Sequence, residues 1–371
     1  MEERQHRALL PLVLGSVVVL ALACAPSRKP SSSSGLFVAP SASASVDPAS
    51  LGLVPRTLSS SPFSPILAQD GSPFREPIHV SLVSGATLFH LPAGKKTKIG
   101  RLVGEKILWG DLSLKGLPKQ SSWEGFVGRY PDYLWLKISN GSGSDWYRWQ
   151  PKSGFWAADP RRAQPKRVDA QVYPWGPKSL LLVRTDPGLG GEICRLEDLT
   201  APFTTKPPKL MRDAPLLVGT TATGDIVAVY TSPGLVLVHP PKAAPIPYSL
   251  EDYPGFQPSS IVVRGADDII ISGTSGASPL ILTIHDHRLT KLEIPMVQPI
   301  TEMVSTSDGL WVLEARGGIT RRDLDGGWTT IPVPPSTRVV DLRVSPADGR
   351  LWLVTSGAED SWMTVGTIQE K

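Results

Sequence analysis

Cysteine is almost absent from this chain, which has only Cys24 and Cys194 among its 371 residues. Two thiols are too few to staple a small secreted module, which relies on several disulfides in place of a large core. They are also too few for a zinc site built on cysteine. The fold must therefore rest on an ordinary apolar core, and the chain is long enough for one large domain or several small ones.

Charge of one sign is also lacking, because 38 Lys and Arg stand against 34 Asp and Glu, a net charge of +4. Proteins that bind nucleic acid cluster their basic residues on one surface. The local basic groups here, at Lys95–Lys98 and Arg161–Arg167, are interpreted as solvated turns. We therefore expect no nucleic-acid partner.

Long apolar runs are missing except near the start of the chain. Leu9–Ala23 is apolar but shorter than the roughly 20 residues that a spanning helix needs. It ends with the small residues Ala21 and Ala23, which is typical of a secretory signal peptide. We predict a signal peptide over residues 1–23, which takes the protein out of the cytoplasm.

Cys24 follows this run directly, and the order of apolar run, small residues and cysteine resembles the type II signal peptide of bacterial lipoproteins. Ala21 stands where that family usually has Leu. The resemblance implies that Cys24 is lipidated and anchors the protein to a membrane, since more than one acyl chain gives stable anchoring. With Ala25 next, it implies the outer membrane of the cell envelope, on the periplasmic or the surface side. A plain signal peptide and an uncleaved anchor are the alternatives.

Residues 24–69 are rich in Ser, Ala and Pro, as in Ser31–Ser34 and Ser41–Ser45. Such a segment has too few large apolar side chains to offset the entropy lost on ordering. We predict a disordered tether that holds the following domain away from the membrane. The small apolar island Leu51–Val54 is expected to stay undocked.

A steady repeat occupies the rest of the chain, from residue 70 to 371. Proline and glycine, 37 and 34 residues, punctuate it throughout and favour many short strands. Seven apolar stretches that each follow a turn align on one position, which we call the anchor: Phe89, Trp135, Leu181, Val227, Ile270, Trp311 and Trp352. Successive anchors lie 46, 46, 46, 43, 41 and 41 residues apart. This spacing predicts an all-β domain, a β-propeller of seven blades with four antiparallel strands each.

The last unit shows the predicted blade best. Val339–Val344 alternates as a strand, Ser345–Gly349 is a turn, and Leu351–Thr355 is the next strand. The Leu-Trp strands resemble those of bacterial sensor-type propellers, such as the periplasmic domains of hybrid histidine kinases. The anchor tryptophans are expected in the core between blades.

Closure of the ring is expected from the two ends of the repeat. Thr364–Ile368 would be the third strand of the last blade, which leaves that blade without its outer strand. Pro77–Val83 alternates but has no blade of its own in this alignment. Because open edges invite pairing with other chains, we expect these two segments to pair.

Candidate chemistry is sparse. His285–His287 is the only histidine cluster and lacks a visible third ligand, so a solvated loop is expected. Trp146–Trp149 would place Trp146 and Arg148 on one face and Tyr147 and Trp149 on the other. We interpret this group as structural, with a sugar- or peptide-stacking surface as the alternative. We interpret Asp323–Trp328 as a structural turn. We predict no catalytic, metal-binding or cofactor-binding residue.

Three functions remain open. The first is a lipid-anchored, non-enzymatic binding or scaffolding propeller with a protein or glycan ligand. The second is a hydrolase or lyase whose dispersed site lies at the central channel, because propeller enzymes assemble their sites from loops of several blades. The third is a sensory input domain.

Overall fold

The computed structural model describes the following residues of the chain: 53–59, 61–72, 79–91, 98–118, 122–139, 144–158, 170–174, 179–184, 191–195, 215–221, 223–232, 234–333, 337–357 and 363–368. All of them belong to one compact unit, Val46–Lys371. Every regular element in these ranges is a β-strand. None of the residues described forms a helix long and apolar enough to cross a membrane.

The strands after residue 78 form seven sheets in chain order. The first three sheets are β3 (His79–Val83), β4 (Ala86–His90), β5 (Ile99–Val103) and β6 (Lys106–Trp109); β7 (Ser122–Arg129), β8 (Tyr133–Ser139), β9 (Ser144–Gln150) and β10 (Phe155–Ala158); and β11 (Ala170–Pro174), β12 (Ser179–Arg184) and β13 (Gly191–Arg195).

The other four sheets are β14 (Leu217–Thr220), β15 (Ile226–Tyr230), β16 (Leu235–His239) and β17 (Ile246–Ser249); β18 (Phe256–Gly265), β19 (Asp268–Ser275), β20 (Ser278–His285) and β21 (Arg288–Leu292); β22 (Ile300–Thr306), β23 (Gly309–Glu314), β24 (Ile319–Asp323) and β25 (Trp328–Ile331); and β26 (Thr337–Val344), β27 (Leu351–Gly357) and β28 (Met363–Ile368).

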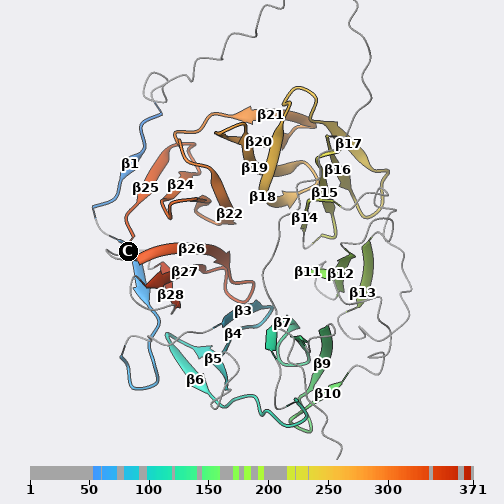
Figure 1. The fold of residues 1–371 in the computed structure, drawn as a ribbon, viewed down its shortest axis with the longest axis vertical. Coiled ribbons are helices and arrows are strands. Elements are labelled where there is room, and N and C mark those ends of the chain that lie inside the picture. The colour runs from blue at the N-terminus through green and yellow to red at the C-terminus, as the bar shows by residue number, and fades with distance from the viewer. Residues whose placement is uncertain are drawn as a thin grey trace, which may run out of the picture. The chain divides into compact units, whose positions relative to one another are not determined.

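The sheets lie around a centre with the first strand of each sheet innermost (Figure 1). First strands of neighbouring sheets contact one another, as β3 does β7, β18 does β22, and β22 does β26. This arrangement is a β-propeller and confirms the all-β propeller part of the predicted fold class. The predicted strand count is wrong in part. Five of the described sheets, rather than seven, consist of four antiparallel strands alone, and one of these five is completed by β2 (Phe63–Pro65) beside β28. The β22–β25 sheet gains a parallel fifth strand, and three strands are described in the β11–β13 sheet.

The anchors occupy the second strand of every sheet, on β4, β8, β12, β15, β19, β23 and β27. Trp135, Trp311 and Trp352 are at most 1 % exposed, which confirms their predicted place in the core. The core consists of apolar layers between neighbouring sheets, which we call seams. The β18–β21 and β22–β25 sheets share one seam, the β22–β25 and β26–β28 sheets a second, and the β26–β28 and β3–β6 sheets a third.

Residues 53–68, which we call the strap, run along the outer edges of three sheets. These are the β22–β25 sheet, the β26–β28 sheet and the first sheet, β3–β6. Its strand β1 (Arg56–Thr57) pairs in parallel with β25, and its strand β2 (Phe63–Pro65) pairs antiparallel with β28 (Figure 1). Leu67 then bridges to β6, where its amide donates to the carbonyl of Glu105 at 3.0 Å and its carbonyl accepts from the amide of Ile107 at 3.0 Å. The strap therefore links the last sheet to the first.

Each of the three seams receives at least one apolar side chain from the strap. Leu53 packs against the seam between the β18–β21 and β22–β25 sheets, and Phe63 against the next one. Ile66 enters the seam between the last and first sheets, beside Phe89 and Trp352, and is only 2 % exposed. Burying such a side chain completely contributes about 1.5–3 kcal/mol.

The strap corrects the predicted closure. Pro77–Val83 was expected to pair with Thr364–Ile368, but its described part forms β3, the innermost strand of the first sheet. The partner of β28 is Phe63–Pro65, which we had placed in the tether. Residues 53–68 of the predicted 24–69 tether thus belong to the propeller, and Leu53 of the apolar island does dock. Residues 24–52 lie outside the described residues.

We predict that Ile66→Ala destabilises the propeller by about 2–5 kcal/mol, because it empties a closed site between the first and last sheets. Val54→Ala, in the same strap but at a side chain that is 69 % exposed, is the matched control and should change stability by less than about 0.5 kcal/mol. Urea unfolding followed by tryptophan fluorescence measures both. Equal effects of the two substitutions would show that the strap does not hold the ring closed.

Candidate functional site

Four innermost strands carry a β-bulge at the same level. The residue after each bulge pairs with the residue two positions beyond the anchor: Gly125 with Lys137, Ser260 with Ser272, Glu302 with Leu313, and Asp341 with Val354. A bulge inserts one unpaired residue, re-aims side chains, and is common near binding sites. We call these positions on β7, β18, β22 and β26 the bulge level.

The inserted residues at the bulge level are all exposed; they are Glu124, Ser259, Thr301 and Val340. Their polar groups are all tied to neighbouring strands, and the Glu124 carboxylate pairs with the Lys137 Nζ atom on β8 at 2.6 Å. The Ser259 hydroxyl donates to the carbonyl of Ile300 at 2.7 Å, and the Thr301 hydroxyl donates to the carbonyl of Leu313 at 3.1 Å. Val340 is 44 % exposed, so an apolar side chain also faces solvent here. The innermost surface thus mixes acidic, hydroxyl and apolar groups.

Buried serines join neighbouring sheets at this level. The Ser260 hydroxyl accepts the amide of Met303 at 2.9 Å, and the Ser81 hydroxyl accepts the amide of Phe126 at 3.0 Å. On the next sheet, each of these two amides belongs to the residue that directly follows the first paired residue after a bulge: Met303 follows Glu302, and Phe126 follows Gly125. A buried N–H without a partner would be costly, so the two hydroxyls fix the bulges in place.

Glu302 is the titrating group of the site. Its Oε1 accepts the Ser260 hydroxyl at 3.2 Å. The pKa of Glu302 is raised to about 7, mainly by burial and then by the negative charge of Asp341, while Ser260, the Met303 amide and Arg343 oppose the shift. Near neutral pH this carboxyl therefore exchanges its proton.

Asp341 and Arg343 extend the polar row along β26. The Arg343 Nε and NH2 groups lie 2.6 and 2.5 Å from the Asp341 Oδ2 atom. The guanidinium also donates to the carbonyl of Val80 on β3 at 3.4 Å. The row of Ser260, Glu302, Asp341 and Arg343 thus lies on β18, β22 and β26, and Arg343 connects it to β3. It offers carboxylate acceptors and one guanidinium donor to a ligand, or a proton from Glu302.

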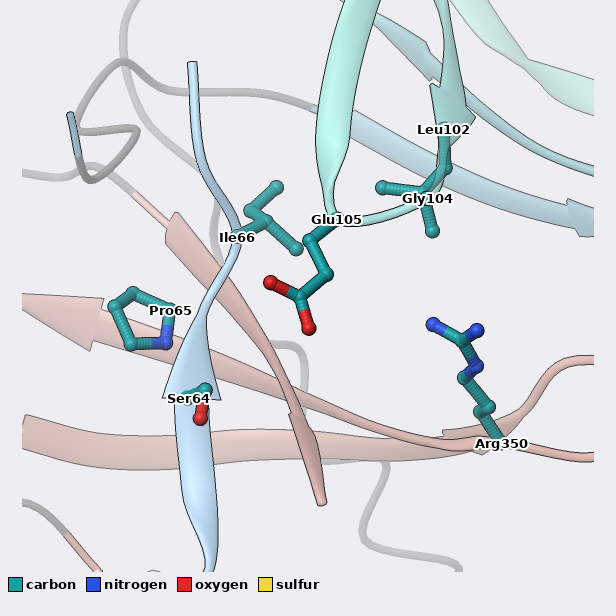
Figure 2. Close-up of a pocket in the computed structure, with 7 residues that line it drawn as sticks. All are labelled: Ser64, Pro65, Ile66, Leu102, Gly104, Glu105 and Arg350. Atoms are coloured by element: carbon teal, nitrogen blue, oxygen red, sulfur yellow. The ribbon is translucent and has the colours of Figure 1, made fainter. Parts of the chain in front are cut away.

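A cleft lies where the ring closes (Figure 2). It is lined by three strap residues, by the β5–β6 turn and by the residue before β27: Ser64, Pro65, Ile66, Leu102, Gly104, Glu105 and Arg350. In Figure 2 the carboxylate of Glu105 and the guanidinium of Arg350 point into the space between the labelled residues. Arg350 forms an ion pair with Asp348, with 3.2 Å between the Nε and Oδ2 atoms. This cleft forms where the strap passes beside the first and last sheets.

The sequence-predicted candidates fall elsewhere. Cys24, the predicted lipidation site, lies outside the described residues. His285–His287 forms the tight turn from β20 to β21, with Asp286 and His287 at φ of 49° and 57° and both imidazoles more than 70 % exposed. This matches the expected solvated loop. Across the described ranges, no group of three or more His, Cys, Asp and Glu could hold a metal.

The aromatic group Trp146–Trp149 lies on β9. Tyr147 and Trp149 are 4 % and 6 % exposed and pack in the seam between the first two sheets. The Arg148 guanidinium lies 5.8 Å from the ring centres of both Tyr133 and Trp135. The predicted alternation of the side chains along β9 is correct. The face that carries Tyr147 and Trp149 is buried between the two sheets, so these two rings are not available for stacking on a ligand.

The Asp323–Trp328 turn, between β24 and β25, is structural as expected. Its Asp323 accepts Arg321 Nε at 2.6 Å and the Thr329 hydroxyl at 2.9 Å, and its Trp328 is 5 % exposed.

Sequence reasoning missed the bulge level altogether. The alignment on the anchors contained a signal, because Gly125, Ser260, Glu302 and Asp341 stand at nearly the same distance before their anchors. The bulges that place them together leave no local mark in the sequence.

Comparison with known proteins gives a likeness in fold. No protein-family model matches the chain, and no curated protein matches it. The structure of YCF48 bound to D1 peptide matches with TM-score 0.58 and 9% identity over 85% of this chain and 100% of that one. A streptogramin B lyase matches with TM-score 0.51 and 14% identity over 79% of this chain and 92% of that one.

The extracellular domain of a putative hybrid two component system, BT4673 of B. thetaiotaomicron, matches with TM-score 0.52 and 12% identity. The match covers 84% of this chain and 42% of that one. At these identities the likeness establishes the propeller fold, and it includes the sensor-type propellers that the sequence resembles.

We predict that Glu302 makes the free energy of unfolding fall as the pH rises from about 4.5 to about 7, because the folded state keeps the Glu302 proton over this range while the unfolded state has released it. Buried His90, whose pKa is lowered to about 4, acts in the opposite direction, so the contribution of Glu302 is measured as the difference between wild type and a variant. Glu302→Gln removes this contribution. Relative to the variant, wild type should lose roughly 2–3 kcal/mol between pH 4.5 and pH 8 in urea unfolding.

Glu293→Gln is the control for this experiment, because Glu293 is 56 % exposed and pairs with Lys291 on an outer strand. It should follow the wild-type pH profile. A Glu302→Gln profile parallel to that of wild type would show that Glu302 has an ordinary pKa.

Proposed function

We propose that this protein is a lipid-anchored propeller of the cell envelope that binds a protein segment at the bulge level without transforming it. The observation that carries the proposal is the set of four bulges, which brings exposed side chains from four sheets to one level of the innermost strands. Bulges distort a sheet, and their repetition at equivalent positions serves a common surface.

The chemistry of the bulge level favours a peptide ligand. Glu302 and Asp341 accept from amide or ammonium donors, Arg343 donates to carbonyls, and exposed Val340 offers an apolar contact. A protein segment supplies all three complements. The structure of YCF48, similar in fold, is bound to D1 peptide, which supports this class of ligand.

An enzymatic role at the same place is the second candidate, a hydrolase or lyase acting through Glu302. A carboxyl with a pKa of about 7 suits general acid–base catalysis near neutral pH. A streptogramin B lyase also has a similar fold. Binding is preferred because Asp341 is engaged by Arg343 and Ser260 bridges Met303 and Glu302, so the row is built as a rigid surface.

The anchor is tested by metabolic labelling with palmitate. We predict that the full chain incorporates label and that Cys24→Ser does not, since the thiol of Cys24 would carry the lipid. Cys194→Ser should label as wild type does. Equal labelling of wild type and Cys24→Ser, or none in either, would contradict the anchor and leave the binding proposal standing.

The ligand is tested by photo-cross-linking in intact cells, with p-benzoylphenylalanine placed at Thr301 or Val340. Both positions should give discrete, protease-sensitive adducts, because both face the bulge level. Lys291, exposed on the outer strand β21, is the control position and should give none. Arg343→Ala should weaken the adducts.

The outcomes separate the candidates. Adducts at Thr301 no stronger than at Lys291 would contradict protein binding, and protease-resistant adducts would indicate a glycan ligand. Release of an altered ligand by wild type but not by Glu302→Gln would support the enzyme.

A further inference from the structure

The strap is held unevenly along its length. At its C-terminal end Ile66 is buried and Leu67 bonds on both sides to the β6 strand region. At its N-terminal end β1 has only two residues, both exposed, and Leu53 is partly buried. One further bond, from the Leu58 amide to the Thr330 carbonyl at 3.2 Å, ends this pairing. Residues 53–58 are therefore the part that detaches first.

The joint between β1 and β2 suits such a movement. Ser59, Ser61 and Pro62 lie between the two strands, and the Phe63 amide is bonded back to the Ser61 hydroxyl at 3.4 Å. This local bond belongs to the β2 side of the joint. Residues 53–58 can swing away while Phe63, Ile66 and Leu67 continue to close the ring.

The place that residues 53–58 cover is an acceptor for an extended strand. It combines the outer edge of β25 with an apolar seam that includes Met296 and Trp328. An uncovered sheet edge is a template for pairing with another chain. The side chain that fills this seam from the strap is Leu53, and the residues that follow the β25 edge are Arg56 and Thr57.

We propose that residues 53–58 exchange between two copies of this chain, each copy placing its β1 on the β25 edge of the other. The occupant is a second copy because the same six residues are seen to fit this edge and this seam. The exchange is reciprocal, since each copy both gives and receives β1, and it closes as a two-fold dimer. The proposal rests on the strap and is independent of the ligand at the bulge level.

Copies held near one another favour the exchange. Within one chain β1 finds β25 at the high effective concentration that a short connection gives. A second copy competes only when its own concentration is comparable, as it would be for copies crowded on one surface. Dimer formation should therefore rise steeply with protein concentration.

The test uses full chains with Cys24→Ser and Cys194→Ser, so that only introduced thiols react. One chain, with one affinity tag, carries Thr57→Cys, and the other, with a different tag, carries Thr330→Cys, its partner in the register. The two are mixed at increasing concentration and treated with a short bis-maleimide. The expected result is a covalent dimer carrying both tags, which grows with concentration and is lost when the first chain also carries Leu53→Asp.

Two controls fix the interpretation. The matched control replaces Thr330→Cys by Thr290→Cys, a threonine exposed on the outer strand β21 of the neighbouring sheet, and should give no such dimer. A single chain with both Thr57→Cys and Thr330→Cys should cross-link within itself at every concentration. A doubly tagged dimer no greater than the Thr290 control overturns the proposal, and so does failure of the single chain to cross-link, because β1 would then not occupy the β25 edge in solution.

Discussion

The packing of one sheet against the next is the interaction on which this structure depends. A propeller sheet has little core of its own, and its apolar residues are buried only in the seams that it shares with its neighbours. Every sheet must therefore have a neighbour on each side, and the ring is as stable as its weakest seam. Ile66 stands in the seam between the last and first sheets, where two segments from opposite ends of the chain must meet.

The polar groups at the bulge level also depend on the packing of each sheet against its neighbour. First strands of neighbouring sheets approach closely, and a bulge leaves an amide that the sheet ladder does not satisfy. Ser81 and Ser260 satisfy such amides from the adjacent sheet, so they fix the spacing of two sheets as well as the shape of one strand. Glu302 is half-buried at this level, and desolvation is the main cause of its raised pKa.

Much of the propeller can be predicted from the sequence because its signals are local. Each anchor follows a turn and stands in a short apolar stretch, and Trp311 and Trp352 lie where the repeat places them. The strap could not be predicted, since Phe63 and Ile66 stand in a Ser- and Pro-rich composition that favours disorder. What orders this segment is the pairing of Phe63–Pro65 with residues 366–368, some 300 residues later, and the seam that Ile66 enters between sheets from both ends of the chain. No local pattern encodes such contacts.

The strap and the bulge level act on the same sheets from opposite sides. Phe63 packs at the outer side of the seam between the β22–β25 and β26–β28 sheets, while Glu302 and Asp341 stand on their innermost strands. Trp311, Leu313 and Leu342 fill the seam between them. A packed seam shifts as a unit, because interiors are dense and do not compress. If binding of a ligand at the bulge level changes the free energy of strap release through this seam, release of the strap must change the binding free energy of the ligand by the same amount.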